Sequence, residues 1–263
     1  MAFAQSSARP IEGAVATLGV SDRVAFLRKT YAHLAVALLV FAGVTGFMMR
    51  FMTETSFKFS KFAFEGRWNW AMVLIAFMVV GWVAERLARS ETSKGLQYGG
   101  LALACIAEGV ILQPMLWVLF LRFGHENDFT FNAAGNITAF AASGLAIKIL
   151  MESIIITMVI FVGLTATVFI TKKDFSFMRG ALTIATFAAL GVIVGSMIFG
   201  FQLGAIFSGA MILLMSLYVL YQTSLVMQYF PPTGYVAAAL MLFSTIATLF
   251  WYVLRLMMEL NRR

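Results

Sequence analysis

Glu108 is the residue in this sequence best placed for chemistry, because it is a lone carboxylate inside a long apolar stretch. Residues 95–121 contain no other Asp or Glu and no Lys or Arg. An ionisable side chain at membrane depth is energetically costly and is by default a functional candidate. Pro114 follows six residues later, where it would free the carbonyl of Val110 and kink the helix. A carboxylate beside a free carbonyl is a plausible way-station for a proton or a cation.

A structural role for Glu108 is the alternative. Hydrocarbon favours the neutral acid, whereas an arginine partner favours the carboxylate. Glu108 would then be protonated, or paired with an arginine at the end of a span, such as Arg50 or Arg255. Arg255 is the favoured partner if the last helix is central.

Other catalytic or metal-binding groups are scarce. The chain has one cysteine and two histidines, and neither histidine belongs to a His-Glu-x-x-His motif. A three-histidine zinc site is therefore excluded, and so is an intramolecular disulfide. No Ser–His, Cys–His or aspartate pair falls at membrane depth. We expect no enzymatic activity, no metal and no cofactor.

The composition places the chain in a membrane. Of its 263 residues, 61% are hydrophobic and 12% are charged, about half the charged fraction of a soluble domain. The mean hydropathy is +0.90. The net charge of +7 is explained by Lys and Arg between apolar segments, where lipid head groups attract them. We therefore expect the lipid bilayer, and not nucleic acid, as the partner of these charges.

Seven apolar segments are long enough to cross a bilayer, for which about 20 residues are needed. Four precede residue 180, at 30–49, 68–84, 95–121 and 153–171. Residues 180–254 contain no Asp, Glu, Lys, Arg or His and hold three more. The turn sequences Gly200–Gly204 and Tyr229–Gly234 divide this block. The fold class is thus an all-α integral membrane protein, a seven-transmembrane-helix bundle with the last helix central, over residues 30–258.

Two segments leave the topology open. Residues 132–151 are read as an interfacial helix or a long lead-in to the fourth span; if they span instead, the count becomes eight. Residues 1–29 form a polar N-terminal segment without the apolar region of a signal peptide. Lys and Arg divide almost evenly between the two sides, so the positive-inside rule does not discriminate strongly. The basic N-terminus and the loop after residue 171 favour an N-terminus inside.

Five segments in order resemble the Bax inhibitor-1 family, in its bacterial branch. The N-terminal Phe26-Leu-Arg-Lys-Thr-Tyr-Ala-His-Leu and the third-span Ala107-Glu-Gly-Val-Ile-Leu-Gln-Pro are similar to family motifs. The strongest match is the fourth span with its loop, Phe161-Val-Gly-Leu-Thr-Ala to Thr171-Lys-Lys-Asp-Phe-Ser-Phe. Looser matches are Leu217-Tyr-Val-Leu-Tyr-Gln-Thr and the segment from Ala238 to Arg255. The resemblance covers about residues 20–258 and implies a bacterial inner-membrane protein.

This sequence departs from the family at one pair of positions. In members that leak calcium in a pH-dependent way, the resemblance implies two paired aspartates on the sixth and seventh helices. Here the corresponding residues are Gln222 and Thr245, which lie about 10–17 Å from the intervening turn at 1.5 Å per residue and could meet. An amide and a hydroxyl can hydrogen-bond but cannot titrate or offer a charge to a divalent cation. A polar helix–helix contact is favoured over ion handling for this pair.

Three functional classes follow. The resemblance and Glu108 favour an atypical cation or proton leak channel or transporter without the di-aspartyl pH switch. The candidate pathway or gate residues are Glu108, Gln222, Thr245 and Arg255. The family-motif loop Lys172-Lys173-Asp174 is either a solvated turn or a contact with a partner or gate. The alternative function is a non-conducting regulator that binds another membrane protein, such as a membrane protease or stress factor. An intramembrane enzyme fits the sequence least well.

Overall fold

The computed structural model describes residues 14–17, 19–90, 92–142 and 144–262. Seven of the described helices are long and apolar enough to cross a membrane, which confirms the expected fold class. They are α1 (Val20–Phe51), α3 (Arg67–Ala88), α4 (Lys94–Phe123), α5 (Gly144–Thr171), α6 (Arg179–Phe199), α7 (Ala205–Gln228) and α8 (Tyr235–Leu260).

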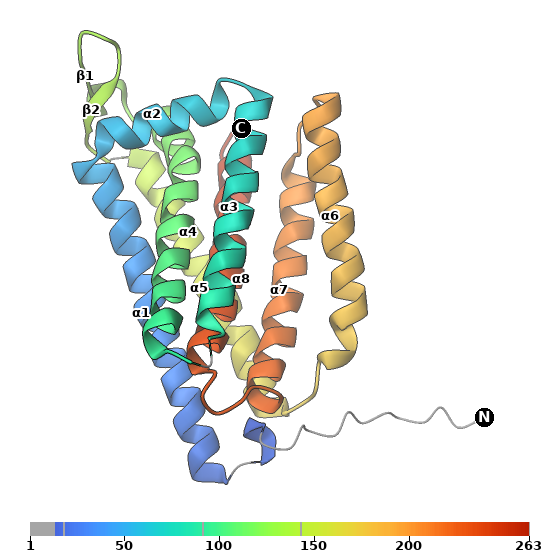
Figure 1. Cartoon of the computed structure of the whole chain (residues 1–263). Coiled ribbons are helices and arrows are strands. Elements are labelled where there is room, and N and C mark those ends of the chain that lie inside the picture. Colours follow the sequence, from blue (N-terminus) through green and yellow to red (C-terminus); the bar gives the residue numbers. More distant parts are fainter. Residues whose placement is uncertain (1–13, 18, 91, 143, 263) are drawn as a thin grey trace.

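Successive long helices run in opposite directions, so that the bundle has two ends (Figure 1). The lower end in this view carries the start of α1 and the turn between α7 and α8. The upper end carries the end of α8 and a short helix, α2 (Thr53–Phe64), which lies across the bundle. Tyr229–Gly234 joins α7 to α8 as a tight hairpin, as its Pro-Pro sequence predicted.

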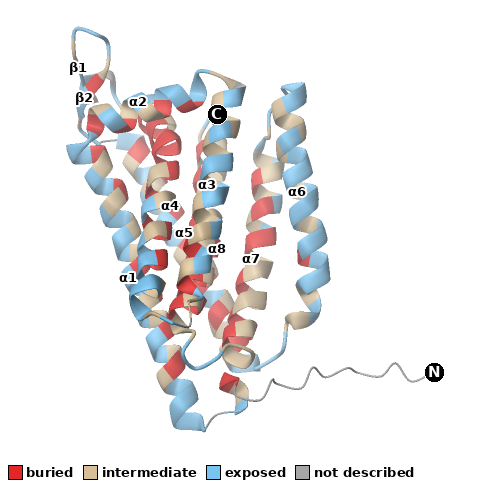
Figure 2. Ribbon diagram, viewed as in Figure 1, coloured by how far each residue is buried: buried red, intermediate tan, exposed pale blue. Residues whose placement is uncertain are grey.

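α8 forms the centre of the bundle. It packs against α7, α1, α5 and α4, and Leu242, Phe243 and Leu249 on it have no exposed surface. No charged residue occurs in α8 before Arg255, so other helices can surround it without burying an unpaired charge. α6, by contrast, is mostly exposed on the outside of the bundle (Figure 2), with large apolar side chains such as Phe187 and Phe199 on its surface. The central position expected for the last helix is confirmed.

The N-terminal part of the chain is more structured than a polar segment over residues 1–29 implied. Residues 1–13 lie outside the described residues. A 3-10 turn, η1 (Val15–Thr17), follows, and the backbone amide of Val15 donates to the carbonyl of Phe230 at 2.9 Å. α1 then begins at Val20, ten residues before the apolar stretch, because its first turns lie beyond the apolar part of the span.

Residues 132–151 are neither an interfacial helix nor an eighth span. Two short strands, β1 (Phe129–Phe131) and β2 (Ile137–Phe140), pair as an antiparallel hairpin. Asn132 sets the turn, because its side-chain oxygen accepts the backbone amides of Ala134 and Asn136 at 3.0 and 2.9 Å. α5 then starts at Gly144 rather than at Ser153, so the part from Gly144 onward is a lead-in continuous with the fourth span.

A buried hydrogen-bond network fixes α2 on the end of α4. Ser56 of α2 donates to the side-chain oxygen of Gln113 at 2.7 Å and accepts from the indole nitrogen of Trp117 at 2.8 Å. The Gln113 amide also donates to the carbonyl of Gly109 at 2.8 Å. Ser56 and Gln113 are fully buried, so each of these groups depends on the others for its partner.

We predict that Ser56→Ala lowers the stability of the purified protein. The substitution leaves the side-chain oxygen of Gln113 and the indole nitrogen of Trp117 without their partner, and an unsatisfied buried polar group costs about 1–3 kcal/mol. Thr55→Ala is the matched control, because Thr55 is exposed on the same helix. Thermal unfolding in detergent should show a clearly lower Tm for Ser56→Ala only. Equal Tm values for the two variants would contradict the role assigned to this network.

Candidate functional site

Glu108 lies near the middle of α4 and is half-buried. It lines two neighbouring cavities. Within the described part of the chain its carboxylate has no hydrogen bond and no ion pair. α4 remains helical on both sides of Pro114, so an unwound segment beside Glu108 is not found there. The carboxylate therefore faces cavity space without an ion pair, although Arg89 lines the lower cavity and Arg255 the middle one.

Three cavities form a row along the bundle. The lower and middle cavities lie between α3 on one side and α6 and α7 on the other, with α4 and α8 behind them, whereas the upper cavity is lined by α2, α3, α4 and α8. The lower cavity has a volume of about 540 Å³, the middle cavity about 420 Å³ and the upper cavity about 300 Å³. α3 makes few direct contacts with α6 or α7, which leaves this space open between them. The row extends from the lower part of α3 to the upper end of α8.

Neighbouring cavities share their lining residues, and both shared sets include a charged side chain. Phe77, Glu108 and Thr248 line both the lower and the middle cavity. Trp70, Trp251 and Arg255 line both the middle and the upper cavity. A carboxylate thus stands at the first junction and a guanidinium at the second. We refer to the three cavities together as the polar row.

Gln222 and Thr245 meet on the wall of the lower cavity. The Thr245 hydroxyl donates to the side-chain oxygen of Gln222 at 2.7 Å, which links α8 to α7. Both residues line the same cavity as Glu108. The contact expected from their distances to the turn is therefore present, and it is made by two groups that carry no charge.

Arg255 does not pair with Glu108. Its guanidinium forms a salt bridge with Glu259, with Nε and Oε1 at 3.4 Å, and also donates to the carbonyl of Leu203 between α6 and α7. Glu259 lies four residues after Arg255 on the same helix, where the two side chains are neighbours. Arg255 is thus satisfied by Glu259 and Leu203 at the upper end of α8, although it lines the middle cavity together with Glu108.

Sequence reasoning missed several polar residues of the lower cavity. Glu85 and Arg89 form an ion pair at 2.7 Å where α3 reaches the lower end. Thr186 of α6 and Tyr218 of α7 are hydrogen-bonded at 2.8 Å, and Ser244 adds a further hydroxyl. The signal available in the sequence was spacing: Ser244 and Thr248 are four apart, as are Tyr218 and Gln222, so each pair shares a helix face.

The family-motif loop is anchored by Asp174. Tyr229, directly after α7, donates to Asp174 at 2.8 Å, and Asp174 also accepts the backbone amide of Ser176 at 2.8 Å. Burial and this carboxylate raise the pKa of the Tyr229 hydroxyl above its ordinary value. Lys172, with a φ of 51°, and Lys173 are exposed. The loop is therefore a fixed turn that presents two lysines to solvent.

The side chains that face the polar row do not form a metal centre. Among the described residues, no group of three or more His, Cys, Asp and Glu side chains could hold a metal ion. Glu108 is accompanied mainly by hydroxyl, amide and thioether groups. Such a lining can hydrate or weakly coordinate a mobile cation, whereas tight binding of a divalent cation requires several oxygen ligands, including carboxylates.

The bundle and its charged cavity junctions define a polytopic α-helical membrane protein with a central C-terminal helix. Residues 129–263 match the family model described as "Inhibitor of apoptosis-promoting Bax1". This chain belongs to the Bax inhibitor-1 family.

The chain is also similar in sequence to two individual proteins. The chain is 25% identical to Bax inhibitor 1 of Schizosaccharomyces pombe over 255 residues, which cover 92% of this chain and 79% of the relative. It is 32% identical to the uncharacterized protein PA2604 of Pseudomonas aeruginosa over 112 residues, or 41% of this chain. That match spans about half of the length of PA2604, 49%.

Because Gln222 and Thr245 are in contact, two acidic residues at these positions should make the stability of the protein depend on pH. We predict that the double variant Gln222→Glu with Thr245→Asp unfolds at a higher temperature at pH 5 than at pH 8. Two carboxylates this close cannot both be charged without repulsion, so the folded state is favoured when one of them is protonated.

The isosteric Gln222→Glu variant alone and the unmodified chain are the controls, and both should show a smaller pH effect. Thermal unfolding measured at the two pH values provides the comparison. If the double variant responded to pH no more than the unmodified chain, the two positions would not be coupled in the folded protein.

Proposed function

We propose that this Bax inhibitor-1 family member lets small cations or protons leak across the membrane along the polar row. The observation that carries the proposal is Glu108, a carboxylate with no ion pair and no hydrogen bond among the described residues, at the junction of two cavities. A buried unpaired charge is costly, and a chain gains nothing in stability by keeping it. A carboxylate that attracts a mobile cation or carries a proton accounts for its position.

The uncharged side chains beside Glu108 favour transient rather than tight binding of a cation. Gln222, Thr245 and Thr248 offer oxygen atoms on the same wall as Glu108. These neutral groups can replace part of a cation's hydration shell and release the ion again. Conduction requires binding that is favourable enough for entry and weak enough for exit, which one unpaired carboxylate beside hydroxyl and amide oxygens provides.

Arg255 and Glu259 form the gate of the proposed path. The guanidinium stands at the junction between the middle and upper cavities, where its charge opposes a cation. Its salt bridge with Glu259 and its bond to the carbonyl of Leu203 hold it there. In this proposal, movement of the loop after α6, which supplies the carbonyl of Leu203, releases the arginine and opens the upper end.

A non-conducting regulator is the second candidate function. Lys172 and Lys173 are exposed on a turn that Asp174 holds in place, and a fixed basic turn is suited to an acidic surface of another membrane protein. The neutral Gln222–Thr245 pair also favours this role, because it lacks the titrating acids of the pH-dependent relatives. We place the protein in the inner membrane of a bacterial cell; PA2604, one of the similar proteins, comes from a bacterium.

We predict that Glu108→Gln lowers cation flux through the purified protein in liposomes by about tenfold or more, the effect of losing one charge-assisted contact. Calcium and potassium uptake into dye-loaded liposomes would be measured in parallel. Glu65→Gln is the control, because Glu65 is an exposed carboxylate in a weak surface pair with Lys61 at 4.0 Å. Thr248→Leu, at the same junction, should also reduce flux. Unchanged flux in both junction variants would exclude this path.

The pH dependence of flux should belong to Glu108 alone. Gln222 and Thr245 do not titrate, so Glu108→Gln should show the same flux at pH 6 and pH 8. The unmodified chain, measured in the same liposomes, gives the reference. A large difference between the two pH values that persists in Glu108→Gln would show that another group controls the path.

A further inference from the structure

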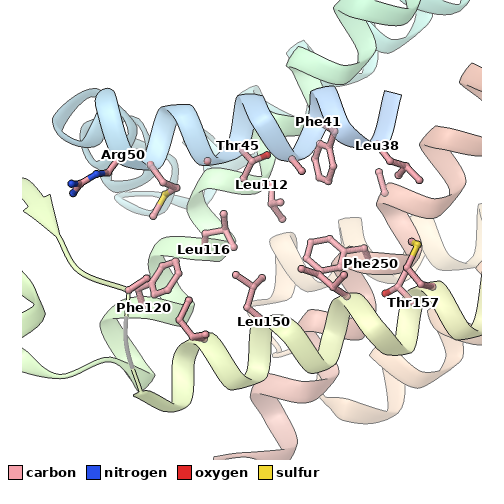
Figure 3. Close-up of a pocket in the computed structure, with 18 of the residues that line it drawn as sticks. Leu38, Phe41, Thr45, Arg50, Leu112, Leu116, Phe120, Leu150, Thr157 and Phe250 are labelled. Atoms are coloured by element: carbon pink, nitrogen blue, oxygen red, sulfur yellow. The ribbon is translucent and has the colours of Figure 1, made fainter. Parts of the chain in front are cut away.

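A second large cavity lies on the opposite side of α8 and has a different chemistry. It has a volume of about 630 Å³ and is lined almost entirely by apolar side chains of α1, α4, α5 and α8. Figure 3 shows it between α1 and α5, with Arg50 at one end and Leu38 and Thr157 at the other. α1 and α5 make few direct contacts with each other, so the cavity separates them. We refer to it as the apolar groove.

The apolar groove opens toward the lipid. Ala42 and Gly46 of α1 and Ile154 of α5 line it and are exposed. The small side chains at 42 and 46 lie one turn apart on the same face of α1, and they leave the entrance wide. A molecule in the groove would therefore enter sideways from the bilayer rather than from water.

The length of the apolar groove matches one leaflet. Leu38 and Arg50 mark its extent along α1, and twelve residues at 1.5 Å each span about 18 Å. Half of a hydrocarbon core of about 30 Å is about 15 Å. Arg50 is the next-to-last residue of α1, directly before α2 crosses the upper end, so its side chain lies at head-group depth.

Arg50 supplies a charge at the mouth of the apolar groove. It is exposed, and in the described part of the chain it has no acidic partner. The other cation beside the groove, Lys148, is paired with Glu152 at 3.8 Å. A guanidinium binds phosphate through two parallel hydrogen bonds, and basic pockets between membrane helices bind anionic head groups.

We propose that the apolar groove is a binding site for an anionic phospholipid, with one acyl chain between α1 and α5 and the head-group phosphate on Arg50. The acyl chain packs against Leu112, Leu116 and Phe250 at the back of the groove. The site recognises charge through Arg50 and chain length through the depth of the groove. It is separate from the polar row and does not depend on ion conduction.

Delipidated full-length protein in detergent would be tested with dioleoyl phosphatidylglycerol, dioleoyl phosphatidylcholine and oleate. Native mass spectrometry gives the number of bound molecules, and thermal unfolding gives the shift in Tm. One phosphatidylglycerol should bind with the largest increase in Tm. Phosphatidylcholine should bind about tenfold more weakly, because it lacks the net negative charge that Arg50 recognises.

Two pairs of variants locate the site. Gly46→Leu fills the apolar groove, whereas Gly43→Leu adds the same side chain elsewhere on α1; at both glycines a Cβ atom meets nothing within 4 Å. Arg50→Gln removes the proposed phosphate ligand, and Lys61→Gln removes a cation at the same end of the bundle. Gly46→Leu and Arg50→Gln should each weaken phosphatidylglycerol binding about tenfold, whereas both controls should retain it.

Several results would overturn the proposal. Equal binding of phosphatidylcholine would remove the role of charge, and preferential binding of oleate would assign the groove to a free fatty acid. A loss of binding in Gly43→Leu equal to that in Gly46→Leu would place the lipid elsewhere. A dimer that Gly46→Leu dissociates would show that a second copy of the chain occupies the groove.

Discussion

The absence of water from the hydrocarbon core governs this structure, because every polar group there must find a partner within the protein. Many hydroxyl groups of the spans meet this demand locally, whereas those of Thr30, Thr45 and Ser208 are buried without a hydrogen-bond partner among the described residues. Ser153, Thr157 and Thr248, for example, donate to the carbonyl four residues earlier at 2.7–2.8 Å. Such bonds satisfy the side chain without requiring another helix. Polar groups that do not follow this rule are therefore informative.

Three further polar groups or pairs do not hydrogen-bond to the backbone of their own helix alone, and each has a different role in the bundle. Ser56 and Gln113 use each other, and their bond fixes α2 to α4. Thr245 of α8 hydrogen-bonds to Gln222 of α7, so the two helices are linked at this place by two uncharged side chains. Glu108 has no partner in the described chain and faces cavity space. The Ser56–Gln113 pair contributes to stability. The Gln222–Thr245 pair holds α7 and α8 together beside the polar row, and Glu108 is the residue on which the proposed function depends.

Features that depend on residues close together in the sequence could be predicted, whereas features that depend on packing between distant segments could not. The seven spans and the α7–α8 hairpin depend on hydropathy and on Pro-Pro turn chemistry, which are local properties. α2 was missed because three of its four buried residues, Thr53, Ser56 and Ser60, are polar, so the helix shows no apolar periodicity. The β1–β2 hairpin was missed because strands of three and four residues are too short to show alternation.

The candidate site was predictable in part for the same reason. Glu108 was identified because one charge in an apolar stretch is visible in the sequence. The meeting of Gln222 and Thr245 followed from counting residues on two sides of one turn. The alternative that paired Arg255 with Glu108 was wrong, because Arg255 contacts the carbonyl of Leu203, which comes from a loop whose position depends on the packing of α6 and α7. Cavity shapes, which depend on how several helices pack together, could not be predicted.

α8 connects the two cavity systems. Ile246, Ala247 and Phe250 face the apolar groove, while Thr245, Thr248 and Trp251 face the polar row. Ala247 lines both the groove and the middle cavity, so a single small side chain separates them at that level. Protein interiors are densely packed, so a shift of α8 on one side also moves the side chains that it presents on the other side. An acyl chain in the groove would therefore press on the helix that carries the hydroxyls of the polar row, and lipid composition becomes a variable of any flux through it.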